Sequence, residues 1–140
     1  MGRIMAIDYG DQRTGVAVSD LLGILCGEAV TIEEWNAERL AQKLTDFAKA
    51  RQVELLLLGL PKNMDGTEGP RAELYKAFAA QVEEATGMKP VLWDERRTTI
   101  DAHRILFEAG KNAKKRKKTV DAVAASLILE GYLTFKKVNG

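Results

Sequence analysis

Two apolar segments, residues 4–7 and 53–58, constrain most strongly how this chain can fold. The first is continuously apolar and ends at Asp8, and the second ends just before Gly59. Runs of this length and composition are typical of β-strands that other elements cover on both faces. We therefore expect a sheet between two layers of helices, and a content of 46% hydrophobic residues is sufficient for such a core.

The other segments complete an α/β pattern. Turn residues over 10–14 and alternation over 15–19 predict a hairpin with the first strand, 24–32 predicts a third strand, and 90–93 predicts a short last strand. Apolar residues at helical spacing predict four helices: one capped by Asn36, one from Pro70 to Gly87, one over 102–109 and one capped by Thr119. The order β-β-β-α-β-α-β-α-α predicts a mixed five-stranded sheet with helices on both faces, in a single domain covering residues 1–140.

The composition narrows the chemistry available to the chain. One cysteine, Cys26, and one histidine, His103, exclude an internal disulfide and a cysteine-rich zinc site, and leave little room for catalysis by several imidazoles. No apolar run approaches a membrane span and no signal-peptide pattern is present, so we expect a cytoplasmic protein without membrane contact. Trp35 and Trp93 could stack on bases, but we expect them to fill the core or its margin.

Three acidic residues are placed to converge at one edge of the sheet. Asp8 ends the first strand, Glu95 follows the last strand, and Asp121 is expected in the first turn of the closing helix. Converging carboxylates repel one another unless divalent cations neutralise them, and their hard oxygens suit Mg²⁺ or Mn²⁺. Two such ions can activate water and stabilise the leaving oxygen of a phosphodiester, which predicts a metal-dependent phosphodiesterase with these residues as metal ligands and catalytic groups. The competing interpretation of each acid is a helix cap or a turn former. For Asp20 and Asp94, a turn role at a strand end explains the residue as well as a role in the site does, so we leave both outside the catalytic set.

The positive charge is concentrated in one segment. Residues 111–118 contain six of the 21 basic residues, so that 15 remain against 20 acidic ones elsewhere. This asymmetry favours contact with a polyanion, although a solvated loop is the alternative. Arg13 either meets a phosphate or pairs with Asp11 or Asp20. The candidate nucleic-acid-binding residues are Arg13, Lys62, Asn63, Arg96, Arg97, Lys114, Lys115, Arg116, Lys117 and Lys118.

Four motifs, in order along the chain, resemble those of the YqgF/RuvX family, described as Holliday junction resolvases and as pre-16S rRNA nucleases. They are residues 8–20, Gly59-Leu60-Pro61 with Met64, Gly66 and Gly69, residues 94–99, and 121–125 with 127–129. The resemblance implies a ribonuclease-H-like fold and places Asp8, Glu95 and Asp121 at the positions of the family's catalytic acids. It implies processing of the 5′ end of pre-16S rRNA in ribosome biogenesis, with Holliday junction resolution as the alternative.

Two hypotheses from other classes remain open. One is a non-catalytic RNA-binding factor of ribosome assembly, and the other is a nucleotide-binding module, because Asp8 and Gly10 also resemble the phosphate loop of the actin and sugar-kinase superfamily. The expected partners are structured RNA or branched DNA, together with ribosomal particles. We expect a monomer or a weak homodimer, and only junction resolution requires a symmetric dimer with two active sites.

Overall fold

The computed structural model describes residues 2–61, 67–94 and 113–139, and the side chains of residues 121–138 in the last range. Within these residues five strands form a sheet: β1 (Arg3–Asp8), β2 (Arg13–Ser19), β3 (Cys26–Glu33), β4 (Val53–Leu60) and β5 (Val91–Asp94). The strand order is β3-β2-β1-β4-β5. β2 is antiparallel to β1 and β3, whereas β4 is parallel to β1 and β5. The predicted mixed sheet is confirmed.

Two of the helices begin and end where local sequence signals predict. The Asn36 side chain accepts a hydrogen bond of 3.0 Å from the Arg39 N–H at the start of α1 (Ala37–Ala50). Pro70 occupies the first turn of α2 (Pro70–Thr86), and Gly87 ends it with a φ of 79°. The helix expected over 102–109 lies outside the described residues. Within the described part of the chain, every helix lacks the combination of length and hydrophobicity needed to cross a bilayer.

The closing helix starts earlier than we expect from its sequence. α4 (Ala113–Asn139) begins six residues before Thr119, so the predicted cap is wrong. Lys and Arg are good helix formers, and a run of them continues a helix despite a capping residue further along. Asp121 consequently lies about two turns inside α4 rather than in its first turn. The positive end of the helix dipole therefore does not act directly on its carboxylate.

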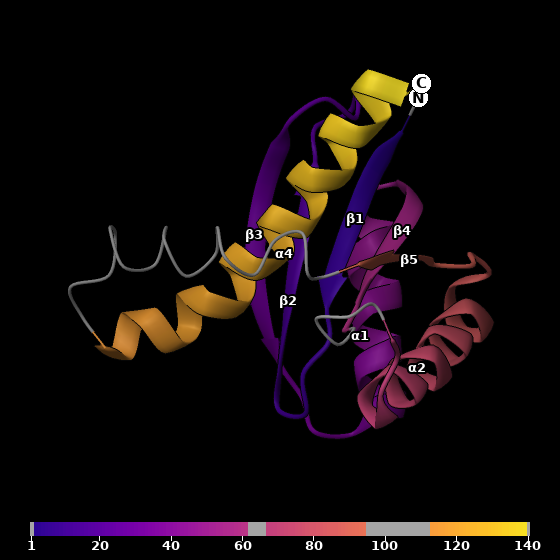
Figure 1. Ribbon diagram of the computed structural model, residues 1–140, viewed down its shortest axis with the longest axis vertical. Coiled ribbons are helices and arrows are strands. Elements are labelled where there is room, and N and C mark those ends of the chain that lie inside the picture. The colour runs from indigo at the N-terminus through magenta and orange to yellow at the C-terminus, as the bar shows by residue number, and fades with distance from the viewer. Residues whose placement is uncertain (1, 62–66, 95–112, 140) are drawn as a thin grey trace.

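The sheet separates two hydrophobic layers. α1 and α2 pack on one face and α4 crosses the other, as Figure 1 shows. On β1, Met5 and Ile7 belong to the α1 and α2 layer, whereas Ile4 and Ala6 pack toward α4. Since side chains alternate along a strand, Asp8 belongs to the face that α4 covers. The side on which the candidate acid lies is thus set by the same alternation that builds the core.

Candidate active site at the carboxyl end of the sheet

Asp8 has a glycine beside it on each of the two neighbouring strands, β2 and β4. It pairs with Gly15 of β2. On its other side Ile7 aligns with Leu58, which makes Gly59 the next residue beside Asp8. The half-buried Asp8 carboxylate therefore has no neighbouring side chain in its own row from either adjacent strand.

Gly15 allows α4 to approach the Asp8 edge of the sheet. A Cβ atom at Gly15 would lie 1.8 Å from the carbonyl oxygen of Asp121, a distance that no real atoms tolerate. Cα atoms of paired antiparallel residues are roughly 5 Å apart, so Gly15 links Asp8 on one side to Asp121 above it. The structure thus places the backbones of two of the three predicted acids next to Gly15.

Arg13 is a cation that acts on Asp121. Burial raises the pKa of the Asp121 carboxyl, and the positive charge of Arg13 lowers it in part. Arg13 shares a face of β2 with Gly15, two residues away. Asp20 lies at the other end of β2, where its carboxylate accepts a hydrogen bond of 2.8 Å from the Ile24 N–H. The predicted turn role of Asp20 is confirmed, and its suggested pairing with Arg13 is wrong.

The turn that follows Asp8 is tied down at several points. The Tyr75 hydroxyl donates a hydrogen bond of 2.6 Å to the Tyr9 carbonyl, and the Tyr9 ring stacks on Phe78 with centroids 4.0 Å apart. The Gly10 N–H donates to the hydroxyl of buried Thr14 at 3.3 Å. These contacts connect the turn to α2 and β2. They hold the backbone of Asp8 in position before any ligand arrives.

The other predicted site residues are not all described. β1, β4 and β5 run parallel and end at the same edge, and Glu95 is the residue after the end of β5. Lys62, Asn63, Glu95, Arg96 and Arg97 lie outside the described residues. Lys114, Lys115, Arg116, Lys117 and Lys118 lie in the first turns of α4, without described side chains. Among the residues that the structure describes, no three His, Cys, Asp or Glu side chains form a metal-binding group.

A groove beside Arg13 contains a tryptophan whose position we did not anticipate. Its volume is about 410 Å³, and it is lined by Gln12, Arg13, Glu33, Glu34 and Trp35. Trp35 is 77% exposed, so its predicted place in the core or its margin is wrong, whereas Trp93 is 8% exposed as expected. The polar neighbours of Trp35, two glutamates before it and an asparagine after it, are the sequence signal that could have indicated this exposure.

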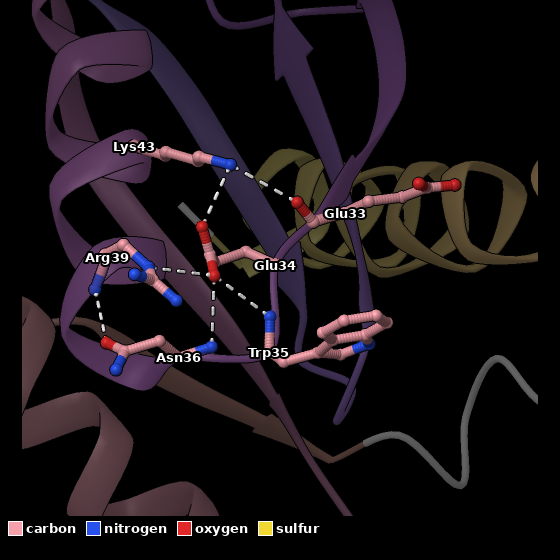
Figure 2. Close-up of polar contacts among 6 residues, drawn as sticks. All are labelled: Glu33, Glu34, Trp35, Asn36, Arg39 and Lys43. Atoms are coloured by element: carbon pink, nitrogen blue, oxygen red, sulfur yellow. Dashed lines mark hydrogen bonds and ion pairs between the residues drawn. The ribbon is translucent and has the colours of Figure 1, made fainter.

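Glu34 holds the turn that carries Trp35 (Figure 2). One of its carboxylate oxygens accepts the backbone N–H groups of Trp35 and Asn36, each at 3.1 Å. The same oxygen lies 3.2 Å from Arg39 Nε, and the other lies 3.0 Å from Lys43 Nζ. These partners, Lys43 above all, lower the pKa of Glu34 to about 2.

Replacing Glu34 with glutamine is expected to change the acid sensitivity of folding. The folded-state pKa of about 2 lies below the ordinary value of 4.5, so the unfolded chain takes up the proton first as the pH falls. The stability advantage of the wild type over Glu34→Gln is therefore complete above pH 4.5 and disappears as the pH approaches 2. Urea denaturation at a series of pH values measures it. Glu84→Gln, at an exposed position on α2, controls for the loss of one charge, and a pH-independent advantage of the wild type over Glu34→Gln would contradict the prediction.

Two relatives show what the chain is similar to in sequence. In sequence, the chain is 44% identical over 140 residues to a protein of Halothermothrix orenii named "Putative pre-16S rRNA nuclease", with 99% of each chain covered. It is 39% identical over 137 residues to a protein of the same name from Carboxydothermus hydrogenoformans, covering 98% of this chain and 99% of the relative.

The three-dimensional comparison concerns the fold. Thermus thermophilus RuvC, solved in complex with a Holliday junction substrate, matches with a TM-score of 0.63 at 12% identity, over 100% of this chain and 98% of RuvC. This likeness confirms the ribonuclease-H-like fold. The family model described as "RuvX: Holliday junction resolvase" matches residues 2–135. Since this match and both relatives span nearly the whole sequence, the chain belongs to the RuvX family.

Proposed function

We propose that residues 1–140 act as one nuclease domain that hydrolyses phosphodiester bonds of structured nucleic acid, with Asp8, Glu95 and Asp121 as metal ligands. The observation that carries this proposal is the contact at Gly15, through which α4 brings Asp121 to the sheet edge where Asp8 lies. Asp8 and Asp121 belong to β1 and α4, and both elements contribute buried residues to the hydrophobic core. This packing fixes the backbone positions of the two acids. Glu95 is added from the sequence motif and from the shared edge at which β1 and β5 end.

The two described acids suit a hard divalent cation. Carboxylate oxygens are the ligands that Mg²⁺ and Mn²⁺ prefer, and burial of Asp121 penalises its charge despite the nearby Arg13. A cation shared by Asp8 and Asp121 would compensate that penalty. When bound, two such ions would activate a water and stabilise the leaving oxygen of the phosphodiester.

The chain's own residues have separate tasks in this proposal. Asp8 and Asp121 hold the cations, and the hydrogen bond from Tyr75 to the Tyr9 carbonyl keeps the Asp8 turn fixed. Arg13 supplies positive charge for a substrate phosphate at the same edge. The other nucleic-acid-binding residues of the proposal are Lys62, Asn63, Arg96, Arg97, Lys114, Lys115, Arg116, Lys117 and Lys118.

The names of the relatives favour RNA as the substrate. We propose that the chain processes the 5′ end of pre-16S rRNA in the cytoplasm, in the context of ribosomal particles. The substrate in the RuvC complex is the reason to retain Holliday junction resolution as the second candidate. A resolvase must cut two strands symmetrically and therefore act as a dimer, whereas trimming of one RNA end requires only one site.

Cleavage of two substrates in Mg²⁺ and in Mn²⁺ tests the proposed function. The substrates are a 5′ fragment of pre-16S rRNA and a mobile four-way DNA junction, and the mass of the active species is measured in solution. We expect metal-dependent cleavage of the RNA. Cleavage of the junction alone, by a dimer, would replace the RNA proposal with resolution. Tight RNA binding without cleavage, in particles as well as in isolation, would favour the non-catalytic assembly factor.

Charge reversal in the basic segment is expected to weaken substrate binding. Lys114→Glu combined with Lys115→Glu removes two phosphate-neutralising charges near the start of α4 and adds two repulsive ones. The slope of log affinity against log salt should fall by about two. Lys136→Glu with Lys137→Glu, at the other end of the same helix, is the matched control. If both pairs had equal effects, the basic segment would have no specific role.

A further inference from the structure

We propose that the groove beside Arg13 binds an unpaired nucleobase of the substrate, stacked on the ring of Trp35. This inference rests on the proposed function, because it assigns one subsite of the same nuclease. It begins from the exposure of Trp35, which presents a large aromatic surface to solvent next to a groove of about 410 Å³. A groove of this volume is in the range of small-molecule sites.

The turn that carries Trp35 is rigid before binding. Glu34 accepts the backbone N–H groups of Trp35 and Asn36, and Asn36 in turn caps α1. Figure 2 shows the indole directed away from this network rather than into it. A ring projected from a fixed backbone loses little conformational freedom when a ligand stacks on it. These contacts are those of a preorganised stacking platform.

The charges of the groove favour a base over a phosphate. The Glu34 charge is compensated by Arg39 and Lys43. Arg13 and Glu33 are paired in register on β2 and β3, so one positive and one negative residue line the groove side by side. A neutral aromatic ring suits such a surface, and the Gln12 amide and Glu33 carboxylate can hydrogen-bond to its polar edge.

Arg13 is common to the groove and to the surroundings of Asp121. This residue lines the groove, and its charge also acts on Asp121. A nucleotide whose base stacks on Trp35 therefore has its phosphate on the side of Arg13, toward Asp8 and Asp121. Bases within a duplex are already stacked, so this subsite selects substrates that carry an unpaired nucleotide beside the scissile bond.

Binding of three RNA probes tests the inference independently of cleavage. The probes are a blunt duplex, the same duplex with a single-stranded overhang, and a third with an abasic overhang, all measured in EDTA. We expect the wild type to prefer the overhang with bases, with quenching of tryptophan fluorescence, since Trp35 is the exposed one of the two tryptophans. Trp35→Ala should weaken binding of that probe roughly five- to hundredfold and leave the blunt and abasic probes unchanged.

Two further variants and three contrary outcomes bear on the same inference. Trp35→Phe keeps an aromatic face and should retain part of the preference, and Leu22→Ala, at a 62% exposed position beyond the far end of β2, should retain all of it. Equal loss for all three probes would overturn base stacking in favour of a general surface effect. Unchanged binding by Trp35→Ala, with metal-dependent cleavage intact, would overturn the subsite alone and leave a protein partner as the occupant. Absence of cleavage by the wild type would instead refute the nuclease.

Discussion

Asp8→Asn is expected to lower metal-dependent cleavage by roughly a thousandfold while leaving the fold and substrate binding intact. Asparagine preserves the shape of the side chain but removes the charge that would hold a divalent cation. A metal supplies several kcal/mol of transition-state stabilisation, and about 4 kcal/mol corresponds to three orders of magnitude in rate. Single-turnover cleavage at saturating enzyme measures the chemical step directly. Filter binding of the same substrate shows whether recognition persists.

Asp20→Asn is the matched control for this substitution. Asp20 also follows a strand of the central sheet, but it lies at the opposite end of β2 and accepts the Ile24 N–H in a turn. The Asp20→Asn variant should cleave the substrate like the wild type. If the Asp8→Asn variant retained activity within tenfold of the wild type, Asp8 would not be a metal ligand. If the Asp8→Asn variant lost both its activity and its cooperative thermal unfolding, the cause would be misfolding.

Gly15→Ala is expected to impair both stability and cleavage without touching an ionisable group. The added Cβ would overlap the carbonyl oxygen of Asp121, and because this is backbone the helix itself must move. Forcing an extra methyl group into a packed contact costs about 1–3 kcal/mol of folding free energy. A displacement of about 1 Å at a reacting group reduces the rate roughly a hundredfold. Denaturant unfolding and single-turnover cleavage measure the two effects separately.

Gly27→Ala distinguishes this effect from a general intolerance of the sheet for alanine. Gly27 lies on β3, where an added Cβ would have the carbonyl oxygen of Val18 as its nearest described neighbour, at an ordinary van der Waals distance of 3.6 Å. That variant should retain both stability and activity. If Gly15→Ala had wild-type activity, the approach of α4 to the sheet at this point would not control the position of Asp121.

Local sequence patterns predicted most of the fold. Continuous apolar runs marked β1 and β4, and Asn36, Pro70 and Gly87 marked helix boundaries, because each acts through its own backbone or its nearest neighbours. The failure at Thr119 has a local origin as well. Thr119 could have capped a helix, but the preceding Lys and Arg residues have a high helix propensity, so α4 begins before Thr119.

The candidate site was predicted in part. Topology placed Asp8 at the carboxyl end of a strand, and the motif order supplied Asp121 and Glu95 as its partners. The sequence did not indicate that Gly15 is the point at which α4 contacts β2, since that contact joins residues more than a hundred positions apart. The polar neighbours of Trp35 could have indicated its exposure, but not the way in which Glu34 connects its turn to α1.

The sequence by itself thus determined the order of the strands and helices that the structure describes and the helix boundaries at Asn36, Pro70 and Gly87, and it supplied the candidate acids. These features depend on backbone preferences and on hydrophobic periodicity, which act over a few residues. The tertiary structure alone decided that Asp121 lies beside Gly15, that Arg13 acts on it, and that Trp35 lines a groove together with Arg13. Each of these features depends on the packing of segments that are distant in the sequence. At Gly15, for example, the absence of a side chain leaves the space that the α4 backbone occupies.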